Sequence, residues 1–437
     1  MAPSFPTKPA LAGVAALILV TAGVWFPFAA PSQDAGGSFD HDTTGWFRGN
    51  THTHSLWSDG NDFPEMIVGW YRDQGYDFIA LSDHNILATT EKWMDVEAIA
   101  KRQRAIGRTA MQKYQAQYAS KPGWIETRDN GGKTEVRLKR IDEYRPLFEK
   151  EGEFLVVQAE EITSSSGEGK PVHINAVNLP GDELIPAVKK EEGLSGEVAM
   201  RTIFQRVDAH EKKTGTPILA HLNHPNFQWA LTAEEMARVA EGRAFEVYNG
   251  HPGVNHLGDA TRPGDERIWD IANTIRLAEL GYPPLLGVAT DDSHTYHGGD
   301  VSPGRGWVVV GSEKLTGDAL IEAMKAGRFY ASTGVYLDRI TWDAASRTLT
   351  VKIRPDGDAT FRTAFIGTRQ DYDATQPAGK NGIGEVFAEI EGLTARFTMP
   401  ADALYLRATI TASARHTNPS YPEQKKQAWT QVVVGKE

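Results

Sequence analysis

The sequence predicts an α/β protein in which a barrel of strands ringed by helices is followed by a small all-β domain. Apolar, strand-like runs alternate with amphipathic helical patterns over most of the chain, which is typical of a largely parallel sheet. Seven such runs in one domain indicate a barrel. From residue 337 onward the sequence consists of short alternating strands with no helix between them, as in a β-sandwich.

The first 40 residues are predicted to be an export signal or an N-terminal anchor, plus a linker. One lysine precedes a long apolar run from Pro9 to Ala30, and a polar, glycine-rich stretch follows. This order is typical of an export signal, and the run is nearly long enough to span a bilayer. Both alternatives stay open, because Trp25, Phe26 and Phe28 stand where a cleavage site has small residues. Either way we expect an exported protein, periplasmic or in the cell envelope if bacterial, that meets a membrane only through this segment if it is uncleaved.

Seven apolar runs are the predicted strands of the main domain, residues 41–336. Helical patterns such as 64–75, 197–215 and 265–281 lie between several of them and end near a glycine, as helix C-termini often do. The link between the third and fourth runs is too short for a parallel crossover, so this pair breaks the pattern. In chain order the runs are residues 45–50, 76–82, 153–160, 172–179, 216–222, 244–249 and 284–290.

Two further segments accompany these strands. Residues 91–150 are predicted to be an insertion, with a polar helix over 94–119 and a hairpin that turns at Asn130-Gly131. Because the insertion carries no cluster of metal-ligand side chains, we interpret it as a lid or a flank. Residues 337–437 are predicted to be a C-terminal β domain, sandwich-like and without catalytic residues.

Composition and charge exclude several functions. The net charge is -11 and there is no basic run, which argues against non-specific nucleic-acid binding and against docking on anionic lipid. The chain has no cysteine, so disulfides, thiolate catalysis and cysteine-based zinc sites are excluded. Any metal must therefore be held by histidine, aspartate and glutamate.

Histidines and carboxylates gather at the ends of the predicted strands. His52 and His54 follow the first run, and residues i and i+2 of an extended strand point to the same side. The later run ends carry Asp83-His84, Glu160-Glu161, His173, His221, His224, Asp291-Asp292 and His294. In a parallel barrel all these ends meet at one face. Without lysine or arginine such a cluster would resist burial, and divalent cations remove that difficulty.

Over residues 45–330 the sequence resembles the PHP (polymerase and histidinol phosphatase) superfamily, motif by motif and in order. The motifs are His52-x-His54, Asp83-His84, Glu161, His173, His224-Pro225 and Asp292-x-His294. The phrases FEVYNG and AGRFYASTG, together with the exported and β-tailed layout, are similar to the branch named after the carbaryl-hydrolysing enzyme. This resemblance implies a distorted seven-stranded β/α barrel and a metal-dependent hydrolase.

The resemblance also implies which residues hold two or three divalent ions. One ion would be held by His52, His54, Glu161 and Asp292, a second by His173, His224 and a bridging Glu161, and a third by Asp59, His84 and His294. The family pattern selects Glu161 over Glu160, His224 over His221 and Asp292 over Asp291. Asp59 suits Mn²⁺ or Fe as well as Zn²⁺, so the metal's identity stays open. Catalysis is expected to depend on Glu161, Asp292 and His294, and Asp83 and Asp291 are expected to orient ligands.

The predicted substrate contacts lie in polar segments just after the sixth and seventh runs. They are Asn249, His251, His297 and Arg305. Arg305 would offer its donor fork to phosphate oxygens, or it is a structural arginine in a turn. We expect a metal-activated water to hydrolyse phosphate mono- or diesters of small molecules. Hydrolysis of a carboxyl ester or carbamate is the alternative, a non-catalytic binding protein is a third reading, and the oligomeric state is open.

Overall fold

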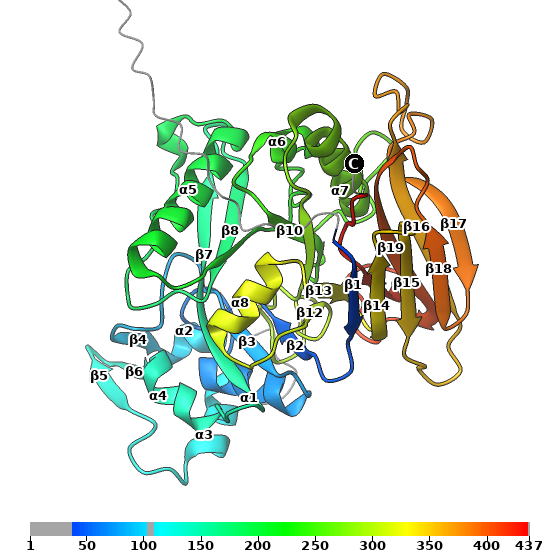
Figure 1. Cartoon of the computed structure of the whole chain (residues 1–437). Helices are drawn as coiled ribbons and strands as arrows, with labels where there is room; N and C mark the ends of the chain where they lie inside the picture. The colour runs from blue at the N-terminus through cyan, green and yellow to red at the C-terminus, as the bar shows by residue number, and fades with distance from the viewer. Residues whose placement is uncertain (1–36, 103–108, 436–437) are drawn as a thin grey trace, which may run out of the picture. The chain divides into compact units, whose positions relative to one another are not determined.

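The computed structural model describes residues 37–102 and 109–435 (Figure 1). The predicted export segment therefore lies, up to residue 36, outside the described residues. Within the described part, no helix is both long and apolar enough to cross a membrane. All described residues belong to one compact unit.

The seven predicted strands are present, and they lie side by side in one mixed sheet (Figure 1). They pair in chain order, and four of the six pairs are parallel, as the alternation of strands and helices predicts. They are β2 (Phe47–Asn50), β3 (Phe78–Leu81), β7 (Leu155–Ser165), β8 (Pro171–Val177), β9 (Leu219–Leu222), β10 (Ala244–Asn249) and β11 (Leu286–Thr290).

Strand β8 runs antiparallel to both of its neighbours. The link from β7 to β8 covers only residues 166–170, so the predicted break in the parallel pattern is confirmed. The register places Glu161 opposite Asn175 and Thr163 opposite His173. Since alternate residues share a face, Glu161 and His173 lie on the same side of the sheet.

The predicted closed barrel is not seen, because both edges of β2 are already paired. One edge pairs with β3, and the other pairs antiparallel with β12 (Trp307–Val310), where Val308 lies opposite Gly49. Within the described residues no strand pairing joins β11 to β2. The two strands approach each other only beyond their ends, through an isolated parallel bridge between Thr53 and Ser293. This bridge is what brings the first and last groups of predicted ligands together.

Helices pack on the sheet through apolar faces. In α5, Ser195 accepts a hydrogen bond from the amide of Val198 (3.3 Å), and Gly215 ends the helix at a φ of 73°, which favours glycine. Its buried face, including Ile203 and Phe204, joins a core cluster with side chains of β8 and β9. The helices here are α1 (Pro64–Asp73), η2 (Lys190–Glu192), α5 (Gly196–Thr214), α6 (Ala233–Arg238), α7 (Asp265–Ile275), η3 (Arg276–Leu280) and α8 (Gly317–Lys325).

The insertion has its own three-stranded sheet. β5 and β6 form the predicted hairpin, with Gly131 and Gly132 at positive φ in the turn. The predicted helix over 94–119 is wrong in part: Met94 pairs with Val136 in a strand, and residues 103–108 lie outside the described residues. The elements are β4 (Lys92–Asp95), α2 (Val96–Lys101), α3 (Ala110–Tyr118), β5 (Thr127–Asn130), β6 (Lys133–Leu138), α4 (Ile141–Tyr144) and η1 (Arg145–Leu147).

The C-terminal strands form two sheets around a shared apolar core. A four-stranded sheet has the order β1-β14-β15-β18, and the large sheet continues through β12-β13-β20-β19-β16-β17. Because that sheet is continuous, the proposed division at residue 336 stays a prediction. The strands are β1 (Phe39–Asp42), β13 (Phe329–Ser332), β14 (Leu337–Asp343), β15 (Thr348–Ile353), β16 (Phe361–Arg369), β17 (Glu385–Glu391), β18 (Thr394–Thr398), β19 (Ala403–Arg415) and β20 (Lys425–Trp429).

Candidate metal centre

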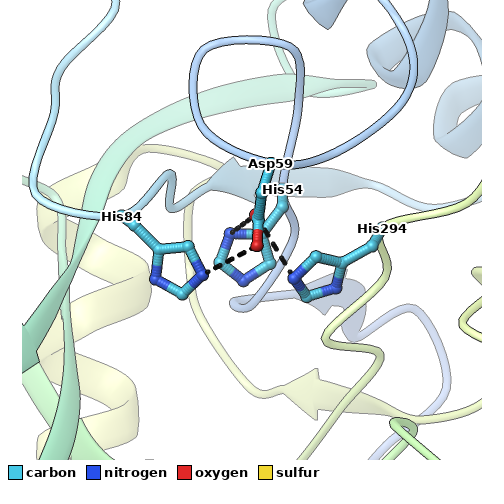
Figure 2. Close-up of side chains that lie close together, drawn as sticks. All are labelled: His54, Asp59, His84 and His294. Carbon is cyan, nitrogen blue, oxygen red and sulfur yellow. Dashed lines mark ion pairs between the residues drawn. The ribbon is translucent and has the colours of Figure 1, made fainter. Parts of the chain in front are cut away.

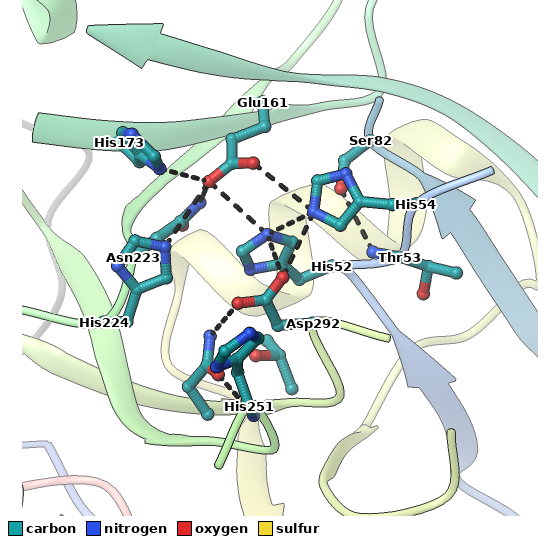
Figure 3. A network of polar contacts seen from close by, with 12 residues as sticks. His52, Thr53, His54, Ser82, Glu161, His173, Asn223, His224, His251 and Asp292 are labelled. Atoms are coloured by element: carbon teal, nitrogen blue, oxygen red, sulfur yellow. Dashed lines mark hydrogen bonds and ion pairs between the residues drawn. The ribbon is translucent and has the colours of Figure 1, made fainter. Parts of the chain in front are cut away.

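Four predicted ligands form a tight, buried group (Figure 3). The Nε2 atoms of His52 and His54 are 3.1 Å apart, and they lie 3.2 and 3.1 Å from Oδ1 of Asp292. The carboxylate of Glu161 lies 3.5 Å from His52 Nε2 and 3.4 Å from His54 Nε2. Atoms that are each about 2.1 Å from one tetrahedral ion lie about 3.4 Å from one another. The spacing therefore fits His52, His54 and Glu161 as ligands of a single ion, with Asp292 beside both histidines.

Two predicted ligands stand on backbone that only glycine adopts easily. Asp292 has a φ of 47° and His224 a φ of 26°, a region that few residues with a side chain occupy. The amide of Asp292 donates to the carbonyl of His52 (3.0 Å), so the strained turn ties the two ligands together. Strained backbone of this kind clusters at functional sites, which supports a role for both residues beyond packing.

Glu161 joins the first group to a second. Its Oε1 lies 3.0 Å from Nδ1 of His173 and 3.6 Å from Nε2 of His224. The same oxygen accepts a hydrogen bond from Nδ2 of Asn223 (2.9 Å). The carboxylate thus faces both imidazole pairs, as a residue that bridges two ions would.

The surroundings of the other Glu161 oxygen, Oε2, indicate whether a cation fits here. Oε2 is buried and has no hydrogen-bond partner among the described residues. Nδ1 of His84 lies 2.7 Å away, but it is also 2.5 Å from Oγ1 of Thr163, with which it forms its hydrogen bond. Without a metal ion this oxygen depends on the proton of the nearby His84, and a metal ion at this position would replace that proton. The donor set therefore fits a divalent cation.

A third group lies on the exposed side of the cluster (Figure 2). The Asp59 carboxylate lies 3.4 Å from Nε2 of His294 and 3.5 Å from Nε2 of His84. It also lies 3.8 Å from Nδ1 of His54, a residue that the sequence placed only in the first group. The side chain of Asp59 is 55% exposed, whereas those of His52 and His54 are fully buried. A substrate would therefore approach from the Asp59 side.

The cluster carries carboxylates whose charges only histidines offset. No lysine or arginine of the described residues pairs with Glu161, Asp292 or Asp59. Burial alone would raise the pKa of Glu161, yet His84 and His52 hold it well below its usual value. Despite burial, Glu161 and Asp59 raise the pKa of His84 to about 11. Without metal, protons on histidines compensate the carboxylates, and cations compete for the same atoms.

Two neighbours of the predicted ligands lie apart from the cluster's contacts. Glu160 points to the opposite face of β7, where its Oε1 accepts from the amide of Ile185 (2.7 Å) and burial raises its pKa to about 7. His221 is fully buried, and its Nε2 lies 3.1 Å from Oγ1 of Thr51. Burial lowers the pKa of His221 to about 4.

Glu246 is, like Asn223, a residue that the sequence analysis missed. It stands in the middle of β10, fully enclosed, and its Oε1 lies 2.7 Å from Nδ1 of His52. Its Oε2 accepts from the amide of His224 and from Nδ2 of Asn249 (2.8 Å each). A carboxylate on the far nitrogen of a ligand histidine fixes its orientation and its tautomer. One indication was available: a lone glutamate inside the apolar run AFEVYN.

The predicted substrate contacts have unequal positions. Asn249 is buried and donates to Oδ2 of Asp292 (3.1 Å), so it orients a ligand. Arg305 is also buried, and its Nη1 donates to the carbonyls of Gly250 (2.8 Å) and Asp300. His297 is buried beside Asp62, with Nε2 and Oδ2 3.3 Å apart. Only His251 is partly exposed beside the cluster, with its ring centre 5.9 Å from that of His294.

Asp83 and Asp291 hold loops instead of ligand histidines. Asp83 accepts from the amide and the hydroxyl of Ser55 (2.8 and 2.6 Å), and it accepts likewise from Ser58. Asp291 accepts from the Tyr71 hydroxyl (2.6 Å) and from the backbone amides of residues 304–306. We expected each aspartate to contact a ligand side chain directly. Instead, each one binds the loop backbone and polar side chains near the ligands, and so positions the ligands indirectly.

Comparison with known proteins finds distant structural likenesses. No model of a known protein family matches the sequence, and no curated protein matches it. The structure is similar to a two-domain protein from Bacteroides vulgatus that contains a predicted PHP-like metal-dependent phosphoesterase, with 15% identity, a TM-score of 0.38, and coverage of 90% of this chain and 97% of that one. It is also similar to a candidate metal-dependent phosphoesterase from Bifidobacterium adolescentis, with 15% identity, a TM-score of 0.29, and coverage of 64% and 96%.

Proposed function

We propose that the protein is a metal-dependent hydrolase of phosphate mono- or diesters, exported and of the PHP type. The observation that carries this proposal is that two ligand groups share the Glu161 carboxylate, and that the third group, around Asp59, shares His54 and His84 with them. When bound, two or three divalent ions of Zn²⁺, Mn²⁺ or Fe supply a water of lowered pKa and charge stabilisation for an in-line displacement.

The chain's own residues hold and orient this site. Glu246 fixes the ring of His52, and Asn249 fixes the carboxylate of Asp292. Asn223 donates to Glu161 and restrains the carboxylate that would bridge two ions. Rigid support of this kind is what a multi-metal site needs, because small misplacements of ligands weaken catalysis strongly.

The open side of the cluster admits the substrate beside Asp59, His84 and His294. His251 borders it, and its Nδ1 accepts from the amide of Gly253 (2.9 Å). In the neutral ring the proton is therefore on Nε2, where it can be donated to a substrate oxygen. The Nη1 of Arg305 is engaged by backbone carbonyls, so the metals, rather than this arginine, would offset the phosphate's charge.

A substrate panel tests the proposal. The metal-free protein is reloaded separately with Zn²⁺, Mn²⁺ or Fe²⁺ and assayed on phosphomonoesters, phosphodiesters, aryl carboxyl esters and carbamates. We expect metal-dependent release of phosphate or alcohol from one of the phosphoester classes. Turnover of carboxyl esters or carbamates alone would favour the alternative hydrolase, and metal binding without turnover of any class would favour a binding protein.

A further inference from the structure

The loop that carries Asp59 is held on one side by the insertion. This loop, residues 55–61 and here called the Asp59 loop, leaves the strand end at His54. Its carbonyls at Ser58 and Gly60 accept from Nη1 of Arg102 (2.6 and 3.3 Å), on either side of Asp59. Nζ of Lys92 donates to the carbonyl of Trp57. Both cations belong to the insertion at 91–150.

Apolar contacts add to these hydrogen bonds. The indole of Trp57 donates to the carbonyl of Lys139 (3.1 Å), at the end of the insertion's hairpin. Leu56 and Trp57 are buried in a cluster whose other members come largely from the insertion. Those members include Met94, Ile99, Met111, Tyr114, Val136 and Leu138. Because burial of large apolar side chains is stabilising, the cluster ties the loop to the insertion.

The remaining anchors of the loop come from the sheet side. Asp83 binds Ser55 and Ser58, and the amide of Asn61 donates to the carbonyl of His294 (2.9 Å). At Gly60 the packing is so close that a Cβ would lie 2.5 Å from the carbonyl oxygen of His54. The loop therefore lies between the sheet and the insertion, and its position depends on both.

We propose that the insertion sets the affinity of the third metal position, with Arg102 as the positioning residue that acts most directly. This inference rests on the proposed function only in taking Asp59, His84 and His294 as a metal position. Asp59 is the one ligand of that group on a loop held from outside the sheet, and its side chain is more than half exposed. Arg102 fixes the two carbonyls that flank it, so removal of the guanidinium should loosen this ligand and leave the buried ligands in place.

The test compares four variants in the full chain. They are Arg102→Ala, Arg102→Lys, Lys101→Ala and Asp59→Ala. Lys101 is the matched control, because it is the adjacent exposed cation at the end of α2. Three quantities are measured: metal content after equilibration at fixed free Zn²⁺ or Mn²⁺, hydrogen exchange of residues 55–61 in metal-free protein, and the melting temperature.

In Arg102→Ala we expect about tenfold weaker binding of one ion, a typical effect of losing an outer contact, with the other ions unchanged. Exchange of the Asp59 loop should accelerate, Arg102→Lys should be intermediate, and Lys101→Ala should match the wild type. Equal ion affinity and equal exchange in Arg102→Ala and the wild type would overturn the proposal. So would an Asp59→Ala protein that retains the full wild-type metal content. The proposed hydrolase would survive either result if phosphoesters are still turned over, because that is assayed separately.

Discussion

The two faces of β7 place neighbouring glutamates in opposite environments. Glu161 faces five histidines and is held ionised, with its pKa well below the usual value despite complete burial. Glu160 faces the side of Ile185, with one backbone amide as its hydrogen-bond partner, and burial raises its pKa to about 7. The two side chains have the same chemistry and similar burial. The groups that face each carboxyl therefore decide whether it is charged.

This contrast separates a cation-binding carboxylate from a packing one. Burial disfavours the charged form in both cases. On the Glu161 face, the nearby imidazoles can release their protons and bind a metal ion instead. The negative charge of Glu161 therefore remains compensated when an ion binds. On the Glu160 face no charged group of the described residues pairs with the carboxyl, so burial favours the neutral acid.

Glu161→Gln should have the largest effect. The amide keeps the size but removes the charge that would offset two cations, so metal content should fall by at least one ion. Hydrolysis should fall about a thousandfold, since the ions stabilise transition-state charge by several kcal/mol. Elemental analysis and steady-state kinetics measure both effects. Glu160→Gln is the control and should retain both. Metal depletion in the control with full occupancy in Glu161→Gln would reverse the assignment of the two faces.

Metal affinity should weaken as the pH falls. The pKa of His84 is raised to about 11, so without metal this histidine holds its proton throughout the neutral range. An ion must displace that proton, and affinity for the ion then drops about tenfold per pH unit for each proton released. Between pH 8 and pH 6 we expect about a hundredfold weaker binding at the Asp59 position. Calorimetric titrations in two buffers of different ionisation enthalpy count the protons, and a pH-independent affinity would contradict the charge balance described for this face.

Glu246→Gln should weaken the first metal position without removing a ligand. The variant loses the negative charge on the far nitrogen of His52, and such changes cost about tenfold to a hundredfold in metal affinity. Binding isotherms for the wild type and the variant provide the comparison. Thr290→Val removes a different hydrogen bond to Glu246 (2.7 Å) and should show a smaller change of the same sign. If the metal affinity of Glu246→Gln equals that of the wild type, Glu246 contributes only to packing.

Glu160→Gln should alter stability without altering the metal centre. Because the pKa of Glu160 is raised to about 7 in the folded protein, folding binds its proton more tightly than the unfolded chain does. The resulting stability is complete below the unfolded pKa of about 4.3 and is lost as the pH rises through 7. Gln cannot ionise, so the variant does not lose this stability. Between pH 5 and pH 8, the free energy of unfolding of the variant should therefore rise by up to about 3 kcal/mol relative to that of the wild type. Urea unfolding of the metal-free proteins at both pH values measures the difference, and parallel pH profiles would rule it out.

The sequence by itself determined the strands and the ligand candidates, because both depend on local patterns. Seven apolar runs became seven strands that are neighbours in chain order. Residues at i and i+2 placed His52 and His54 on one side, and alternation along β7 separated Glu161 from Glu160. The short link after β7 was enough to predict that β8 is antiparallel. The metal identity and the natural substrate have no comparable local pattern.

Only the tertiary structure decided how the sheet edges are used and what surrounds each ligand. The predicted barrel does not close because β12, from much later in the chain, pairs with the edge of β2 that closure would need. Glu246 lies 194 positions from His52 in the sequence, yet their side chains are 2.7 Å apart. Periodicity tells which way a side chain points, but it does not tell what it meets, since hydrogen bonds and charges act over a few ångströms of space. The partners of the buried carboxylates therefore became visible only when the strands were placed side by side.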